Sequence, residues 1–164
     1  MATVPIRPVS ELQPTVERIL AGVYAQLAAL LPDAEVHHVG ATAIPGALTK
    51  GDVDLLVRVS SARFPTAVQV LKRHYAVKQP GNWTATFASF GDDAAHQLPL
   101  GIQVVVAGSE YDFFLFLRDY LIAHHAELEE YNRLKTDHAP EGPEGYWEAK
   151  NRFLERVLKS RPES

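Results

Sequence analysis

Two carboxylates stand one residue apart at the start of a strongly apolar segment. Asp52 and Asp54 open the run DVDLLVRVS, residues 52–60, whose valines and leucines predict a buried strand. Because side chains alternate along a strand, both acids lie on one face, with origins roughly 7 Å apart. Two like charges this close need a cation or hydrogen bonds to compensate them. Carboxylate oxygens suit Mg²⁺ and Mn²⁺, so the pair is a candidate metal site and, in an enzyme, the candidate catalytic pair.

A glycine shortly before the acids adds a candidate anion site. Gly40 ends the predicted strand EVHHVG, residues 35–40, and is followed by the small residues Ala41 and Thr42. If these begin a short helix, their backbone N–H groups point outward and can hold a phosphate, which glycine allows to approach closely. A phosphate cradle beside a metal-binding acid pair indicates a site for a nucleoside triphosphate with Mg²⁺. The simpler alternative is a solvated strand end at which Asp52 forms a turn.

Four polar side chains elsewhere could complete this site. Lys50 stands between the glycine and the acids, where it could neutralise a phosphate. Arg118, in the apolar segment FFLFLRDYL, could reach a phosphate or the acids, and a structural ion pair is an equal alternative. Gln103 is the best-placed polar residue of the segment GIQVVV, and Lys150 lies on a late helix, where a solvated face is the alternative. The seven histidines show no metal-ligand spacing.

The elements that must carry these residues alternate between helix and strand. Apolar spacing predicts a helix over residues 10–31, with Ser10 as its cap, and a second over residues 61–75. Strands are predicted over residues 35–40, 52–60, 75–79, 83–91 and 100–108. Further helices are predicted over residues 109–125, 126–139 and 145–161, with a Pro/Gly loop at 139–145. This order predicts an α/β or α+β fold: a mixed sheet of about four to five strands, flanking helices and a helical C-terminal tail.

Length and composition limit the class of protein. A chain of 164 residues with 46% hydrophobic and 22% charged side chains is typical of one soluble globular domain, here residues 1–164. The net charge of −4 gives no strong signal for nucleic-acid binding. The absence of cysteine excludes disulfides, thiol catalysis and thiolate metal sites. No segment approaches the roughly 20 apolar residues of a membrane helix, so we expect no membrane association and a cytoplasmic location.

The segment VGATAIPGALTKGDVDLLV, residues 39–57, resembles the nucleotidyltransferase-fold signature. That signature consists of a hydrophobic residue, glycine, a small residue, a spacer of about ten residues and two acids alternating with hydrophobic residues. More narrowly, residues 39–46 with Lys50 and Asp54 are similar to the VGSTAVPG block of the GrpB (UPF0157) family of bacterial proteins. The segment LRDYL and the pairs Tyr131–Lys135 and Tyr146–Lys150 resemble later blocks of that family. The resemblance extends from about residue 35 to residue 158.

The resemblance implies a nucleotidyltransferase-like fold in which Asp52 and Asp54 hold Mg²⁺ or Mn²⁺ with a nucleotide. Ala41 stands where the family usually has serine, so Thr42 is the remaining hydroxyl of this block. Active nucleotidyltransferases usually add a third acid from a later strand, where this chain has Gln103. Three functions therefore stay open: nucleotidyl transfer to an unknown acceptor, binding of a nucleotide or another phosphate-bearing small molecule without catalysis, and an interaction domain without a ligand.

Overall fold

A five-stranded mixed sheet forms the centre of the protein. The structure is a computed structural model that describes residues 2–93 and 95–162. The strand order is β2-β4-β7-β6-β5, and only β4 and β7 run parallel. The strands span Glu35–Val39 (β2), Val53–Val59 (β4), Ala76–Val77 (β5), Phe87–Asp92 (β6) and Leu100–Val106 (β7). The predicted mixed sheet with flanking helices is confirmed.

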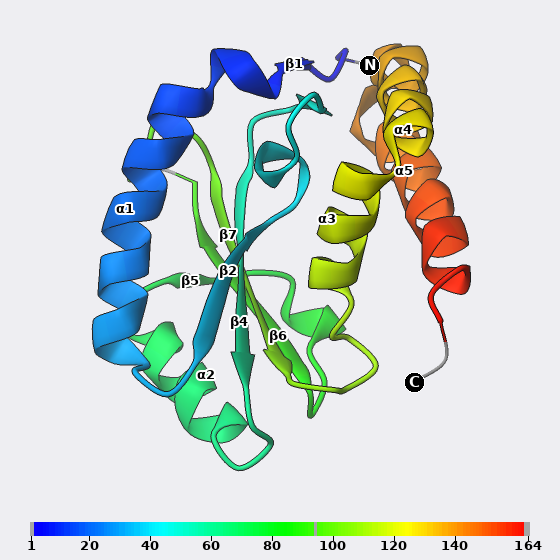
Figure 1. Cartoon of the computed structure of the whole chain (residues 1–164). Coiled ribbons are helices and arrows are strands. Elements are labelled where there is room, and N and C mark those ends of the chain that lie inside the picture. Colours follow the sequence, from blue (N-terminus) through cyan, green and yellow to red (C-terminus); the bar gives the residue numbers. More distant parts are fainter. Residues whose placement is uncertain (1, 94, 163–164) are drawn as a thin grey trace.

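Helices α1 (Gln13–Leu30) and α2 (Phe64–Lys72) cover one face of the sheet (Figure 1). The odd-numbered residues of β4 point toward them, because side chains alternate along a strand. Val53, Leu55 and Val57 are completely buried there among side chains of both helices. The alternation therefore sends Asp54 to the opposite face, as the sequence predicted.

Helices α3 (Phe114–Ala123), α4 (His125–His138) and α5 (Gly142–Lys159) stand on that opposite side (Figure 1). Their shared core consists of Leu121, Leu128, Tyr131, Phe153 and Val157, and it also takes in Val9, Ile44 and Ala47. The helices thus pack on one another and on the segment between β2 and β4. This arrangement leaves room for a pocket between α5 and the sheet.

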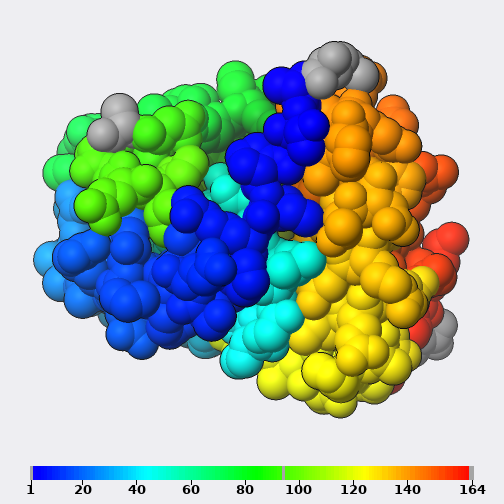
Figure 2. All heavy atoms as spheres, turned by 90° about the horizontal axis from the view of Figure 1, so that it is seen from above, coloured from blue at the N-terminus to red at the C-terminus, as the bar shows by residue number. Residues whose placement is uncertain are grey.

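The N-terminal segment joins the two halves of the molecule. β1 (Arg7–Pro8) pairs antiparallel with β3 (Leu48–Thr49), a short ladder that the sequence did not predict. Val4 packs against Ala139 of the 3₁₀ turn Ala139–Glu141, and its N–H donates to the Ala139 carbonyl. Figure 2 shows this segment (dark blue) lying between the β2–β4 connection (cyan) and the C-terminal helices (orange).

Several local predictions were wrong, and the helix predicted over 109–125 begins only at Phe114. Ser10 does not cap α1, because Val9–Glu11 forms a separate 3₁₀ turn and Leu12 precedes the helix without a side-chain cap. The strand predicted over 83–91 begins only at Phe87, since Pro80–Asn82 forms a 3₁₀ turn and Trp83 instead donates its indole N–H to the Lys78 carbonyl. The predicted loop 139–145 contains the first turn of α5, where a proline fits without losing a hydrogen bond.

Among the described residues, no helix is long and apolar enough to span a membrane.

Candidate functional site

Asp54 occupies a slot in the sheet that only glycine neighbours leave open. In the ladders, Asp54 is opposite Val39 of β2 and Gly101 of β7. A Cβ atom placed on Gly101 would lie 2.6 Å from Asp54 Oδ1, and one placed on Gly40 would lie 2.7 Å from Oδ2. Gly40 also has φ 77°, a backbone conformation that favours glycine. The carboxylate is therefore held between two backbone surfaces.

Enclosure makes Asp54 an unusually weak acid. Burial raises the pKa of its carboxyl to about 6, and the neighbouring negative charge of Asp52 acts in the same direction. The positive charge of Lys150, a hydrogen bond from Gln103 and the charge of Lys50 lower the pKa but do not cancel the effect of burial. Asp54 is consequently ionised at pH 7, and any further positive charge near its carboxylate would stabilise the ionised form.

The Gln103 amide is oriented by this carboxylate. Its Nε2 faces Asp54, to which it donates a hydrogen bond. Its Oε1 is consequently turned away from Asp54, is buried, and has no hydrogen-bond partner in the described part of the chain. A buried acceptor without a partner is uncommon in a folded protein and requires an explanation.

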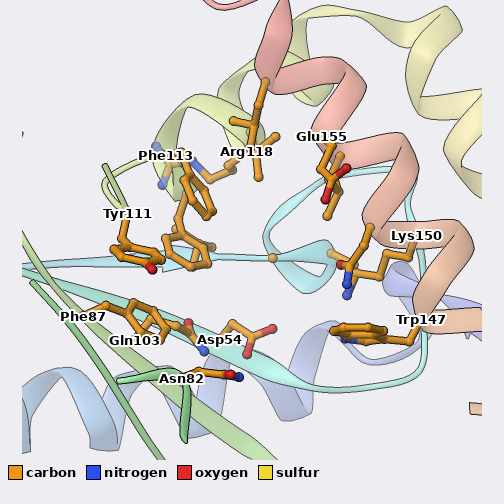
Figure 3. A pocket seen from close by; sticks show the side chains of 18 of the residues that line it. Asp54, Asn82, Phe87, Gln103, Tyr111, Phe113, Arg118, Trp147, Lys150 and Glu155 are labelled. Atoms are coloured by element: carbon orange, nitrogen blue, oxygen red, sulfur yellow. The ribbon is translucent and has the colours of Figure 1, made fainter. Parts of the chain in front are cut away.

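A pocket of about 820 Å³ opens over Asp54 and Gln103. Figure 3 shows its two sides: Trp147, Lys150 and Glu155 come from α5, whereas Phe87, Tyr111 and Phe113 stand at the other end. Its lining also includes Gly40, Ala41, Asn82 and Arg118. The volume is in the range of small-molecule sites, and the combination of apolar walls with a few polar groups is typical of them.

Two cations line the pocket, and they differ in what they contact. Arg118 donates from Nη1 to the His38 carbonyl at 3.0 Å and from Nε to Asp119 at 2.9 Å. Lys150 lies close enough to Asp54 to affect its pKa but makes no hydrogen bond or ion pair among the described residues. Both cations line the Asp54 pocket, Arg118 also forms the structural ion pair that was its alternative, and Lys150 has no such partner in the described part of the chain.

The remaining predicted residues lie outside the pocket lining. Thr42 Oγ1 donates to the Asp52 carbonyl at 3.1 Å and contacts His38 Nε2 at 2.9 Å, so its hydroxyl ties the 3₁₀ turn Ala41–Ala43 to β2 and to the residue before β4. Burial lowers the pKa of His38 to about 4, helped by the charge of Arg118, and the ring is neutral at pH 7. Lys50 Nζ lies 3.1 Å from Asp52 Oδ2. Asp52 therefore has a counter-ion of its own.

The sequence of this chain matches the GrpB protein family over residues 8–160. The chain belongs to the GrpB family. A UPF0157 protein of Vibrio cholerae serotype O1 is 34% identical over 154 residues, which are 90% of this chain and 78% of that protein. The family match begins before the residues that carry the motifs and takes in α1 as well.

Solved structures of other proteins share the fold of this chain. The crystal structure of the conserved protein GrpB from Enterococcus faecalis is similar, with a TM-score of 0.71, 20% identity, and coverage of 88% of this chain and 90% of that one. The Cid1 poly(U) polymerase bound to MgGTP has a TM-score of 0.56 and 14% identity, over 81% of this chain. The chain spans only 45% of that polymerase, so this likeness shows the fold alone.

The residues of this GrpB protein fit one divalent cation better than two. No cluster of three or more Asp, Glu, His or Cys side chains suited to a metal occurs among the described residues. Asp54 lies in the pocket, Asp52 is paired with Lys50, and Gln103 supplies a neutral amide where a third acid would stand. Mg²⁺ commonly binds through one or two carboxylates, with substrate phosphates and water completing its shell. Asp54 can fill that role, with Asp52 adjacent.

Sequence reasoning missed several residues that form the pocket. Gly101 escaped notice because its role depends on the parallel pairing of β7 with β4. Trp147 could have been found from Lys150, because side chains three residues apart on a helix are neighbours, whereas Glu155 lies five residues away and does not follow from that spacing. Tyr111 and Phe113 lie in a loop before α3, and no periodicity marks such residues.

Proposed function

We propose that this GrpB protein binds a nucleotide, or a similar phosphate-bearing small molecule, together with one Mg²⁺ in the Asp54 pocket. The observation that carries the proposal is the position of Asp54. Its carboxylate sits between Gly40 and Gly101, where it has one amide donor from Gln103 and no ion pair with a described residue. An acid kept in this costly state is typical of a functional site rather than of a structural ion pair.

Each polar group of the pocket has a distinct task under this proposal. Ionised Asp54 contributes an oxygen ligand to the Mg²⁺ that accompanies the phosphates, and Mn²⁺ suits the same oxygens. Lys150 neutralises part of the phosphate charge, because it has no other partner among the described residues. The turn that follows Gly40 begins with Ala41, whose backbone N–H group is not needed within that turn. Arg118 adds positive charge from the α3 side.

Nucleotidyl transfer is expected to be slow or absent. A second metal ion requires additional negative ligands, and Gln103 offers a carbonyl oxygen only. The Gln103 Nε2 already donates to Asp54, so the amide would have to rotate before its carbonyl oxygen could point toward Asp54 and a cation bound there. We therefore propose a binding function. Transfer of a nucleotidyl group to an acceptor would need a further carboxylate in the site.

Titration calorimetry with each of the four ribonucleoside triphosphates tests the proposal. We expect at least one to bind in the presence of Mg²⁺ and to bind much more weakly with EDTA. Asp54→Ala should abolish the Mg²⁺-dependent part, whereas Asp33→Ala, which removes an exposed partner of Arg63, should not change it. Absence of binding by every triphosphate would favour an interaction domain without a ligand.

A labelled-nucleotide assay separates binding from catalysis. The wild type should bind and release the nucleotide without transferring it at an appreciable rate. Gln103→Glu restores a third carboxylate at the same length, so this variant should bind Mn²⁺ more tightly and raise any transfer. Fast transfer by the wild type would contradict the binding function and would mean that another residue completes the metal site.

A further inference from the structure

The pocket continues past Asp54 into a part whose walls are aromatic. Four residues form it, and we call them the aromatic arm: Phe87, Tyr111, Phe113 and Phe114. The Phe87 and Tyr111 centroids are 5.1 Å apart with planes at 33°, and those of Phe113 and Phe114 are 4.7 Å apart at 30°. Figure 3 shows the arm at the end opposite Lys150 and Trp147. Aromatic faces and edges arranged in this way favour contact with another ring.

The aromatic arm is neither fully buried in the core nor part of the polar surface. All four of its residues are partly exposed and border the pocket. The hydroxyl of Tyr111 has no hydrogen-bond partner among the described residues, although its ring is packed on Phe87. Gln103, whose Oε1 also has no partner, lies between the arm and Asp54. A ligand ring in the arm would therefore find a hydroxyl and an amide beside it with unused hydrogen-bonding capacity.

The charges of the pocket limit the size of the ligand. Arg118 and Lys150 are the cations that line it, and Arg118 already contacts Asp119 and the His38 carbonyl. Asp54 and Glu155 place two acids in the same lining. A protein that holds a nucleic-acid strand needs a series of cations along the backbone track. This pocket can neutralise one phosphate group or one short chain of phosphates.

We propose that the aromatic arm binds a planar, uncharged heteroaromatic ring with an N–H or O–H donor, carried by a small molecule and not by a nucleic-acid strand. Placing phosphate at Asp54 and Lys150 rests on the proposed function, whereas the ring subsite stands on the arm itself. The ring lies against Tyr111 and Phe113, and its donor is directed toward the oxygens of Tyr111 and Gln103. The ring is either the base of the bound nucleotide or part of a second small molecule.

Calorimetry with four probes tests the subsite: ATP and inorganic tripolyphosphate, both with Mg²⁺, adenosine, and a single-stranded oligonucleotide of about ten residues. The variants are Tyr111→Ala and Phe113→Ala. Phe116→Ala is the matched control, because Phe116 is a partly exposed α3 residue that packs on Tyr120 outside the pocket. We expect each arm variant to weaken ATP about tenfold, as for loss of one stacking ring. Tripolyphosphate affinity should stay unchanged in all three variants.

The four probes distinguish failure of the ring subsite from failure of the phosphate site. If ATP is unaffected but adenosine binding is lost in Tyr111→Ala, the ring belongs to a second molecule and the subsite stands. If tripolyphosphate fails to bind while adenosine binding depends on Tyr111, the phosphate proposal fails and the subsite stands. Equal binding of ATP and of adenosine by the wild type and both arm variants would overturn the subsite. Tighter binding of the oligonucleotide than of ATP would overturn the limit to small molecules.

Discussion

Gly101 lies directly opposite Asp54 in the parallel ladder, and the space left by its missing side chain is filled by the Asp54 carboxylate. A Cβ atom at Gly101 would be 2.6 Å from Asp54 Oδ1 and 3.3 Å from Gln103 Nε2. Atoms cannot approach that closely, so any larger residue at this position must displace the acid or its amide partner. The position of the candidate ligand-binding acid is thus set by a glycine on the neighbouring strand.

Gly101→Ala should therefore impair the site more than the fold. The added methyl group moves the Asp54 carboxylate, and we expect Mg²⁺-dependent nucleotide affinity to fall about tenfold or more, with a loss of stability of about 1 to 3 kcal/mol from overpacking. Gly22→Ala is the matched control, because a Cβ there meets no atom within 4 Å and alanine favours the helix. Nucleotide titrations and urea unfolding of both variants measure the effect. Unchanged affinity in Gly101→Ala would mean that the carboxylate position is not critical.

Asp54→Asn should stabilise the protein at pH 7 while abolishing the Mg²⁺-dependent binding. The folded state raises the Asp54 pKa from 3.8 to about 6, so it binds the proton more tightly than the unfolded state does. The wild type accordingly loses stability as the pH rises from about 4 through 6, and the neutral amide does not. We expect Asp54→Asn to be more stable by about 1 to 2 kcal/mol at pH 7, allowing for partial solvent access. Chemical unfolding at pH 4 and pH 7 checks the difference.

The same titration should affect ligand binding in the wild type. Asp54 must be ionised to contribute to a cation site, so the Mg²⁺-dependent affinity should increase as the pH is raised from 5 to 7, with a midpoint of about 6 before the ligand binds. Bound Mg²⁺ should move that midpoint downward. A pH-independent affinity over this range would indicate that Asp54 does not contact the cation.

Lys135 is a lysine buried in the helical half of the protein, with 1% of its surface exposed. Its Nζ donates to the Leu48 carbonyl at 2.6 Å and lies 3.8 Å from the centre of the Tyr131 ring. Burial, and secondly the charge of Lys150, hold its pKa well below 10.5. The unfolded chain therefore binds an extra proton between the folded pKa and 10.5, and the stability due to this residue rises with pH across that window.

Lys135→Met removes this titration while keeping the length of the side chain. Relative to the variant, the wild type should become more stable as the pH is raised from 7 to about 9.5. Urea unfolding of both proteins at the two pH values measures the difference. A difference in unfolding free energy that stays constant with pH would show that Lys135 remains charged in the fold.

Arg58 and Asp112 form a bidentate pair that holds the loop before α3. Arg58 Nε donates to Asp112 Oδ1 at 2.9 Å and Nη2 donates to Oδ2 at 2.7 Å, while the Gly108 N–H donates to Oδ2 at 2.8 Å. Arg58→Ala leaves the buried Asp112 carboxylate without its main partner, and we expect a loss of about 2 to 3 kcal/mol. Because Tyr111 and Phe113 flank Asp112, ligands that use the aromatic arm should weaken as well, and tripolyphosphate should not. The stability of Arg58→Lys, which cannot form the bidentate pair, should lie between the stabilities of the wild type and of Arg58→Ala.

The sequence predicted the parts of the site that depend on one segment. Alternation along β4 placed Asp54 on the face opposite to Val53, and the positive φ of Gly40 agrees with its predicted role in a close approach. The contact between Asp54 and Gly101 could not be predicted in this way, because it depends on the register between strands that are separated by α2, β5 and β6.

Helix packing set a second limit on prediction from sequence. Lys150 belongs to α5, whose amphipathic pattern shows one apolar face but not which neighbour that face meets. Its ammonium, which no described residue pairs, faces the pocket because Phe153 and Val157 pack into the core with Tyr131. Thr42, by contrast, lies at the predicted turn, but its hydroxyl is used by Asp52 and His38. The sequence therefore predicted the position of the turn correctly but not the contacts of the Thr42 hydroxyl.

The most direct test of the central claim is calorimetric titration of the wild type and of Asp54→Ala with a nucleoside triphosphate, each in Mg²⁺ and in EDTA. The position of Asp54 between Gly40 and Gly101 predicts binding by the wild type that requires Mg²⁺ and is lost in the variant. Circular dichroism of the variant provides the control for folding. Equal affinity of the two folded proteins for the nucleotide, or equal affinity of the wild type with Mg²⁺ and with EDTA, would contradict a cation-dependent nucleotide site at Asp54.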